Sequence, residues 1–169
     1  ILGKQKGWEV FLSDKNSLKP HYRETLTNEG IEWEEGTHTE EKILSADVIM
    51  KSPGIPDKAP IIKKAHEKGI AVISEIEFAS QYTDSLIVGI TGSNGKTTTT
   101  LLTHHIFKEA GLQVGLGGNI GYSFAELVAT ENPPYYVLEI SSFQLDGIER
   151  FAPHIAVLLN ITPDHLDRY

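Results

Sequence analysis

Short apolar runs alternate with segments of helical spacing along the whole chain, and this alternation constrains the fold more than any other feature. A strand, a helix and a second strand in this order form a βαβ unit, and successive units build a mostly parallel sheet. The runs in the second half of the chain are apolar on both faces, which is typical of buried parallel strands. The sequence therefore predicts an α/β protein. The expected strands are residues 8–12, 31–34, 48–50, 71–73, 86–91, 114–116, 135–140 and 155–159, and the expected helices are residues 22–28, 40–44 and 61–68, one that ends at residue 110, and one near residues 124–129.

The chain is expected to form two domains. The segment EIEFASQYTDS, residues 75–85, becomes polar toward its end. We therefore place a boundary near residues 83–85 and expect domains at residues 1–84 and 85–169.

Composition argues against several classes of function. The 15 basic and 23 acidic residues give a net charge of -8, so we expect no binding to nucleic acid or to an anionic membrane, because both need a basic surface. The chain has no cysteine, which excludes disulfides and thiolate metal sites. No apolar run approaches the roughly 18 residues of a membrane span, and no signal peptide opens the chain. We expect a cytoplasmic protein without membrane insertion.

The most informative motif is ITGSNGKTTTT, residues 90–100, which follows an apolar strand and opens a helix. Glycines let successive backbone N–H groups point inward, and a helix N-terminus adds positive potential, so such a turn binds phosphate groups. Lys96 would reach the terminal phosphates of a nucleotide, and the Thr97 hydroxyl would bind a magnesium ion. The motif predicts a nucleotide site made of Ser93, Asn94, Gly95, Lys96, Thr97, Thr98 and Thr99.

One departure from the phosphate-loop pattern G-x-x-x-x-G-K-[ST] leaves an alternative open. The first glycine of that pattern falls on Ile90, whereas the glycines here are Gly89, Gly92 and Gly95. The alternative is a glycine-rich turn that only joins a strand to a helix. Gly-Lys-Thr in register after an apolar strand favours the nucleotide loop.

A carboxylate at the end of another expected strand complements this loop. In YYVLEISSFQL, residues 135–145, Glu139 ends the strand. Magnesium prefers hard oxygen ligands, so Thr97, Glu139 and phosphate oxygens form a plausible set. A strand-end glutamate that faces solvent is the alternative. Ser141 and Gln144 add hydrogen-bonding groups to the same exit loop, where α/β proteins place ligands.

Two more loops are expected at the same edge of the sheet. GGNIG, residues 117–121, follows a strand, and its Asn119 offers both a donor and an acceptor, although such turns are common. NITPDHLDRY, residues 160–169, follows another strand and contains His165 among several polar residues. A single histidine is usually structural or solvated, so a role for His165 near metal or substrate stays open.

The first half of the chain is less explicit. Asp14 ends a strand, a position where an acidic side chain often meets a ribose or a base. Ser52 and Gly54 lie in the rigid turn KSPGIP, whose N–H groups could meet a pyrophosphate. Ordinary turn chemistry explains these residues equally well.

Taken together, the motifs SPG, TGSNGKTTTT, GGNIG, LEISSFQL and HLDRY resemble the Mur ligases of peptidoglycan synthesis. The motifs SSFQL, GGNIG and HLDRY resemble in particular the branch of the family that adds D-glutamate. The likeness covers nearly the whole chain in order. It implies a Rossmann-like N-terminal domain that binds the UDP-sugar, followed by part of a P-loop ATPase central domain.

The resemblance also implies parts that this chain lacks. These are the first strand of the N-terminal domain with its glycine-rich turn, the rest of the central domain with a carbamylated lysine, and a C-terminal domain that brings the D-glutamate contacts. We therefore expect the chain by itself to be inactive.

By resemblance, the expected activity is that of a ligase that uses ATP and Mg²⁺ to add D-glutamate to UDP-N-acetylmuramoyl-L-alanine through an acyl phosphate. We expect a monomeric enzyme of cell wall synthesis, on which cell shape and cell division depend. The resemblance implies catalytic roles for Lys96 and His165, and a second magnesium at His165. It implies substrate contacts in three groups, which are Asp14 and Lys15 for the uridine, Ser52 and Gly54 for the pyrophosphate, and Asn119, Ser141 and Gln144 for the muramoyl end.

Two alternatives remain. Another amino-acid ligase of the same family, including a folylpolyglutamate synthetase, would share the threonine loop but is not expected to carry SSFQL. A nucleotide-binding module without ligase activity would need no acceptor pocket, so UDP-sugar binding would distinguish it.

Overall fold

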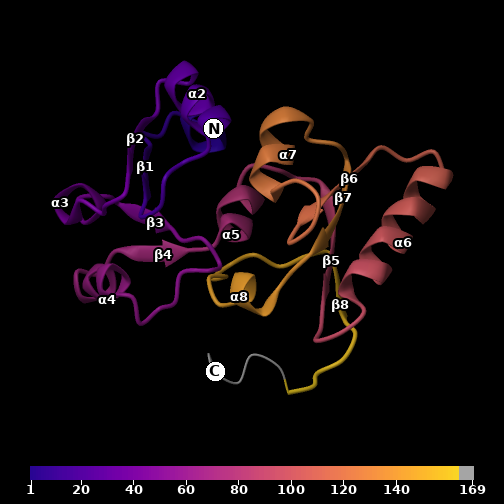
Figure 1. Ribbon diagram of the computed structural model, residues 1–169. Coiled ribbons are helices and arrows are strands. Elements are labelled where there is room, and N and C mark those ends of the chain that lie inside the picture. The colour runs from indigo at the N-terminus through magenta and orange to yellow at the C-terminus, as the bar shows by residue number, and fades with distance from the viewer. Residues whose placement is uncertain (164–169) are drawn as a thin grey trace. The chain divides into compact units, whose positions relative to one another are not determined.

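The computed structural model describes residues 1–163 and shows two compact units (Figure 1). One unit comprises residues 1–49 and 57–72, and the other comprises residues 50–56 and the chain from residue 73 onward. The division therefore lies earlier than the predicted boundary at residues 83–85. The reason is the helix α5 (Glu75–Ser80), which packs against α7 (Phe124–Thr130), so that the residues just before the predicted boundary are part of the second unit.

The first unit is built around a pair of parallel strands, in which Phe11 lies opposite Glu32 and Asp14 opposite Glu35. A second pair, β3 and β4, forms another two-stranded sheet at the boundary of the two units. The core is formed by five buried apolar side chains, which are Leu2, Leu26, Ile31, Ile62 and Ala65. The elements are α1 (Leu2–Gln5), β1 (Phe11–Asp14), α2 (Pro20–Asn28), β2 (Glu32–Glu35), α3 (Glu40–Ile43), β3 (Val48–Met50), α4 (Pro60–Glu67) and β4 (Ala71–Ile73).

The second unit contains a four-stranded sheet in the order β6-β7-β5-β8, and all of its neighbouring strands are parallel. The crossovers follow the βαβ rhythm that the sequence predicts. The remaining elements are β5 (Leu86–Thr91), α6 (Lys96–Glu109), β6 (Val114–Gly118), β7 (Tyr135–Glu139), α8 (Ser142–Leu145) and β8 (Ile155–Leu158).

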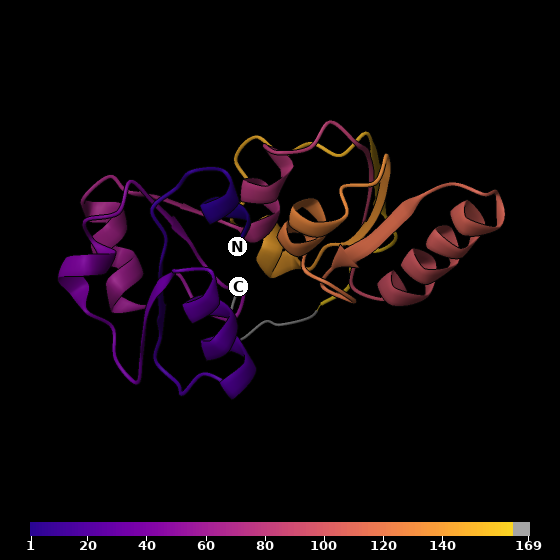
Figure 2. The same ribbon diagram turned by 90° about the horizontal axis from the view of Figure 1, so that it is seen from above.

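Helices cover both faces of this sheet. The long helix α6 lies on one face, and α5, α7 and α8 lie on the other (Figures 1 and 2). Val88, Ile90 and Val137 form the buried centre, and Phe107 of α6 packs against them. Parallel strands all point the same way, so β5, β6, β7 and β8 end at one edge of the sheet, where their exit loops meet.

The fold class is confirmed as α/β with parallel sheets. The expectation of burial on both faces holds for the central strands but is wrong for β8, where Ile155 is 49% and Leu158 61% exposed. The reason is position, because β8 is an edge strand paired only with β5. No helix among residues 1–163 is long and apolar enough to cross a membrane.

Candidate functional site

A glycine-rich loop joins β5 to α6 at the edge where the strands end. Gly92 has a φ of 142° and Gly95, the N-cap of α6, has a φ of 83°, and both values favour glycine. A Cβ on Gly92 would lie 3.1 Å from the backbone nitrogen and oxygen of Asn160, so the loop is also tightly packed. The 14-residue helix that follows directs its N-terminal N–H groups toward the loop.

Lys96, the first residue of α6, folds back into this loop. Its Nζ donates hydrogen bonds to the carbonyl oxygens of Gly92 at 2.7 Å and Ser93 at 3.2 Å. The ammonium therefore adds its charge to the positive end of α6. This is the local charge distribution that an anionic phosphate requires, even in a chain of net negative charge.

A second loop, which follows β8, braces the first. Asn160 accepts from the N–H of Asn94 and donates to its carbonyl oxygen, both at 2.9 Å. The Ser93 hydroxyl donates to the carbonyl of Thr162 at 3.0 Å and accepts from its N–H at 2.9 Å. The side chain of Ser93 thus fixes the shape of the loop, and its predicted contact with a nucleotide stays a prediction.

The predicted carboxylate lies beside the helix start. Glu139 ends β7, is 1% exposed, and accepts a hydrogen bond from the Thr97 hydroxyl at 2.7 Å. Its other carboxylate oxygen accepts from Asn119 Nδ2, also at 2.7 Å. The solvent-facing alternative for Glu139 is therefore wrong. Two expected metal ligands and one expected substrate residue are in direct contact.

The turn that carries Asn119 is tied to the main chain of β7. The N–H of Asn119 donates to the carbonyl of Glu139 at 2.8 Å, and Gly118 is the register partner of Glu139. Gly118 has a φ of 95°, and a Cβ there would overlap the carbonyl oxygen of Glu139. The glycine is therefore required by the close approach of the turn to β7.

Ser141 and Gln144 bond mainly to each other. The Ser141 hydroxyl accepts from the N–H of Gln144 at 3.3 Å, and Gln144 Oε1 accepts from the N–H of Ser141 at 2.9 Å. This capping box starts α8 at the exit of β7. The contacts show a structural role for both residues, and substrate binding by them stays a prediction.

The threonines of α6 divide by helical position. Thr97 and Thr98 are exposed in the first turn, and Thr99 is half-buried. Thr100 is fully buried, and its hydroxyl is the only buried side-chain polar atom without a hydrogen-bond partner among residues 1–163. Only the first three can therefore face a ligand at the helix start.

The donor set at this edge fits a magnesium ion better than a softer metal. Thr97 and Glu139 offer a hydroxyl and a carboxylate oxygen 2.7 Å apart, and magnesium binds hard oxygens together with phosphate and water. No group of three or more metal-binding side chains occurs within the described part of the chain. A metal held by Thr97 and Glu139 would complete its coordination with phosphate oxygens and water.

The turn with Ser52 and Gly54 belongs to the second unit, and both residues are exposed. The N–H of Ile55 donates to the carbonyl of Ser52 at 3.0 Å. The side chain of Lys51, only 7% exposed, closes the turn by donating to the carbonyl of Ile55 at 3.0 Å. Lys51 is not among the predicted site residues, because its contact with Ile55 depends on how the turn folds.

In the first unit, Asp14 ends β1 as predicted, and its carboxylate accepts from the N–H of Asn16 at 2.8 Å. This contact is ordinary turn chemistry. Asp14 and the exposed Lys15 stay predicted uridine contacts.

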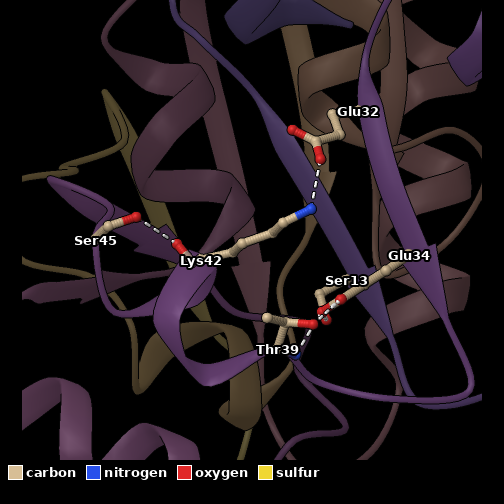
Figure 3. Close-up of polar contacts among 6 residues, drawn as sticks. All are labelled: Ser13, Glu32, Glu34, Thr39, Lys42 and Ser45. Atoms are coloured by element: carbon tan, nitrogen blue, oxygen red, sulfur yellow. Dashed lines mark hydrogen bonds and ion pairs between the residues drawn. The ribbon is translucent and has the colours of Figure 1, made fainter.

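A polar cluster that joins Ser13, Glu34 and Thr39 was not predicted (Figure 3). Glu34 accepts from the Ser13 hydroxyl at 2.7 Å and from the Thr39 hydroxyl at 2.5 Å, and His38 Nδ1 lies 2.7 Å from the Ser13 oxygen. Desolvation opposes ionisation of Glu34, but the bonds from Thr39 and Ser13 and the charge of Lys42 outweigh it, so its pKa lies below the usual value. The cluster fixes the ends of β1 and β2.

The predicted catalytic and metal-binding His165 lies outside the described residues, as do Asp164 and Asp167.

Two family models match different parts of the chain. Residues 1–61 match the MurD N-terminal domain, and residues 90–169 match the Mur ligase middle domain. The two matches together cover most of the chain, and the chain belongs to the Mur ligase family.

Curated relatives are similar over the full length of the chain. The UDP-N-acetylmuramoylalanine--D-glutamate ligase of Christiangramia forsetii is 63% identical, and the protein of the same name from Bacteroides fragilis is 60% identical, each over 169 residues. The alignment covers 100% of this chain and 38% of each relative.

Solved structures support the fold. The UDP-N-acetylmuramate:L-alanyl-gamma-D-glutamyl-meso-diaminopimelate ligase from Neisseria meningitides superposes with a TM-score of 0.60 at 23% identity, covering 99% of this chain and 57% of that chain. A murein peptide ligase from Psychrobacter arcticus gives 0.54 at 21% identity, covering 98% and 40%. At these identities the likeness shows the fold alone.

Proposed function

We propose that the protein is a ligase that uses ATP and Mg²⁺ to join D-glutamate to UDP-N-acetylmuramoyl-L-alanine. The observation that carries this proposal is the direct hydrogen bond between Thr97, in the first turn of α6 directly after the glycine-rich loop, and the buried Glu139. It brings a hydroxyl oxygen and a carboxylate oxygen to the start of the proposed nucleotide-binding helix, where they would hold the metal ion that phosphoryl transfer requires. The relatives named for this activity align with every residue of the chain.

The proposed reaction has two steps. The alanine carboxylate of the UDP-sugar attacks the γ-phosphate of ATP, which forms an acyl phosphate and releases ADP. The D-glutamate amine then attacks the acyl carbon, an amide bond forms, and inorganic phosphate leaves together with the amine proton. A carboxylate is a poor electrophile until it is phosphorylated, which explains the need for ATP.

The residues of this chain would serve mainly to position and neutralise anions. Lys96 and the N-terminus of α6 would bind the phosphates, and Thr97 and Glu139 would hold the metal. When bound, Mg²⁺ supplies positive charge between the two anionic reactants. We assign the muramoyl end of the substrate to Asn119, Ser141 and Gln144. We assign the pyrophosphate to Ser52 and Gly54, and the uridine to Asp14 and Lys15.

We further propose that the enzyme is a cytoplasmic monomer of peptidoglycan synthesis. His165 is proposed as a ligand of a second magnesium and as a catalytic residue.

The direct test is phosphate release by the full-length protein. With UDP-N-acetylmuramoyl-L-alanine, D-glutamate and Mg-ATP together, we expect stoichiometric phosphate and a new UDP-linked product, and neither when any one substrate is omitted. Release with another amino acid but not with D-glutamate would instead indicate a different ligase of the family. No release under any combination would contradict ligase activity.

A further inference from the structure

Asn119 forms two hydrogen bonds with Glu139. Its side-chain nitrogen lies 2.7 Å from Glu139 Oε1, and its backbone nitrogen lies 2.8 Å from the Glu139 carbonyl oxygen. Because a carboxylate can only accept hydrogen bonds, the amide nitrogen of Asn119 must be the atom that faces it. The remaining oxygen, Oε2, is the one that Thr97 contacts.

The hydrogen bond from Asn119 Nδ2 to Oε1 restrains the plane of the Glu139 carboxylate. A free carboxylate turns about its last side-chain bond, whereas one held at Oε1 presents Oε2 in a constant direction, toward Thr97 and the start of α6. In metal sites, groups that hold a ligand in this way set its orientation and so the affinity of the metal.

The turn around Asn119 is shaped for this contact. Gly118 pairs with Glu139 in the parallel ladder and approaches it so closely that no Cβ fits. A Cβ on Gly117 would lie 2.6 Å from Leu127 Cδ1, so α7 limits the turn on its other side. The backbone of Asn119 therefore cannot move away from Glu139 without displacing the turn from its neighbours.

We propose that Asn119 is a positioning residue of the magnesium site, acting through Glu139, in addition to any contact with substrate. The inference rests on the proposed function, because it requires that Glu139 bind a metal with the nucleotide. The GGNIG turn would then contribute to metal affinity. This role is separate from its predicted contact with the muramoyl group.

The test uses Mn²⁺ as a spectroscopic probe. Its binding to the full-length protein is measured by electron paramagnetic resonance in the presence of a non-hydrolysable ATP analogue and without UDP-sugar. We expect Asn119→Ala to weaken Mn²⁺ binding by about 10- to 100-fold. Asn28→Ala, an exposed change at the end of α2, is the matched control and should bind Mn²⁺ like the wild type.

The Michaelis constant for the UDP-sugar, measured on the same variants, separates the two roles. Unchanged Mn²⁺ affinity in Asn119→Ala, with or without a raised UDP-sugar constant, would overturn the positioning role. If the wild type itself bound no Mn²⁺ with the nucleotide analogue, the proposed function would fail and this inference with it. If Asn119→Ala does not fold, Asn119→Ser, whose shorter side chain does not reach the carboxylate, gives the same comparison.

Discussion

Glu77 is a buried side chain that holds a loop of the second unit by its charge. One oxygen of its carboxylate accepts from three successive backbone N–H groups, those of Glu149, Arg150 and Phe151, at 3.0, 3.0 and 2.8 Å. Desolvation would raise the pKa of Glu77, but these three bonds and the charge of Arg150 outweigh it, and the pKa lies below its usual value.

A depressed folded-state pKa predicts acid sensitivity. The stabilisation by ionised Glu77 is fully present above the unfolded pKa of about 4.3 and is lost as the pH falls through the lower folded value. We expect Glu77→Gln to reduce the free energy of unfolding by about 1–3 kcal/mol at pH 7. Urea unfolding should show this difference shrinking below about pH 4. An equal deficit at pH 7 and pH 3 would contradict the account, and the exposed Glu24→Gln serves as the control.

Thr100 presents the opposite situation, a buried hydroxyl without a partner. Because its desolvation is not repaid by a hydrogen bond, Thr100→Val should leave stability unchanged or raise it by up to about 1 kcal/mol. Thr103→Val on the same helix removes a 2.8 Å bond to the carbonyl of Thr99 and should cost about 1 kcal/mol. Thermal unfolding of both variants checks this order, and a larger loss in Thr100→Val would show that its hydroxyl is needed.

At the scale of elements, the turn between β6 and α7 is the most constrained. We expect Gly118→Ala to cost more than Gly111→Ala, although both glycines have positive φ, because only the Cβ at 118 meets another atom. The left-handed conformation costs about 1–2 kcal/mol in each. The overlap with Glu139 should add about 1–3 kcal/mol. Chemical denaturation measures the difference, and equal costs would show that the turn adapts.

Most strands were predicted close to their observed positions, but the strand expected at residues 8–12 was wrong, because β1 spans Phe11–Asp14. The predicted bounds of β3, β4 and β5 agree with the structure, because these short apolar runs are flanked by clear turns. The helix α5 was missed because its segment is partly polar. A local signal existed, since Ser74 and Glu77 have the Ser-x-x-Glu spacing of a helix start, and Ser74 Oγ caps the N–H of Glu77 at 3.1 Å.

The candidate site was predicted in part. The sequence indicated that Thr97 and Glu139 would meet, because a phosphate loop and a strand-end carboxylate share one edge of a parallel sheet. It could not show that Asn119 contacts Glu139, or that Asn160 braces the loop, because these bonds join residues 20 and 66 positions apart. Local patterns do not determine such pairs.

At the scale of the whole molecule, the division into two compact units lies earlier in the chain than the predicted boundary at residues 83–85. The division depends on where α5 packs, and that contact with α7 joins segments about 50 residues apart in the chain. The Glu77 bonds to residues 149–151 add to the same attachment. The assignment of the first unit to the UDP-sugar and the second to ATP stays a prediction.

The central claim is that the loop at the start of α6 binds the phosphates of Mg-ATP. Calorimetric titration of the full-length protein with Mg-ATP tests it on the wild type, Lys96→Ala and the control Lys108→Ala in the last turn of the same helix. We predict that Lys96→Ala weakens binding at least about 10-fold, or about 1.4 kcal/mol, while Lys108→Ala does not. Equal affinity in all three proteins would contradict the claim and leave the loop as a turn that only joins β5 to α6.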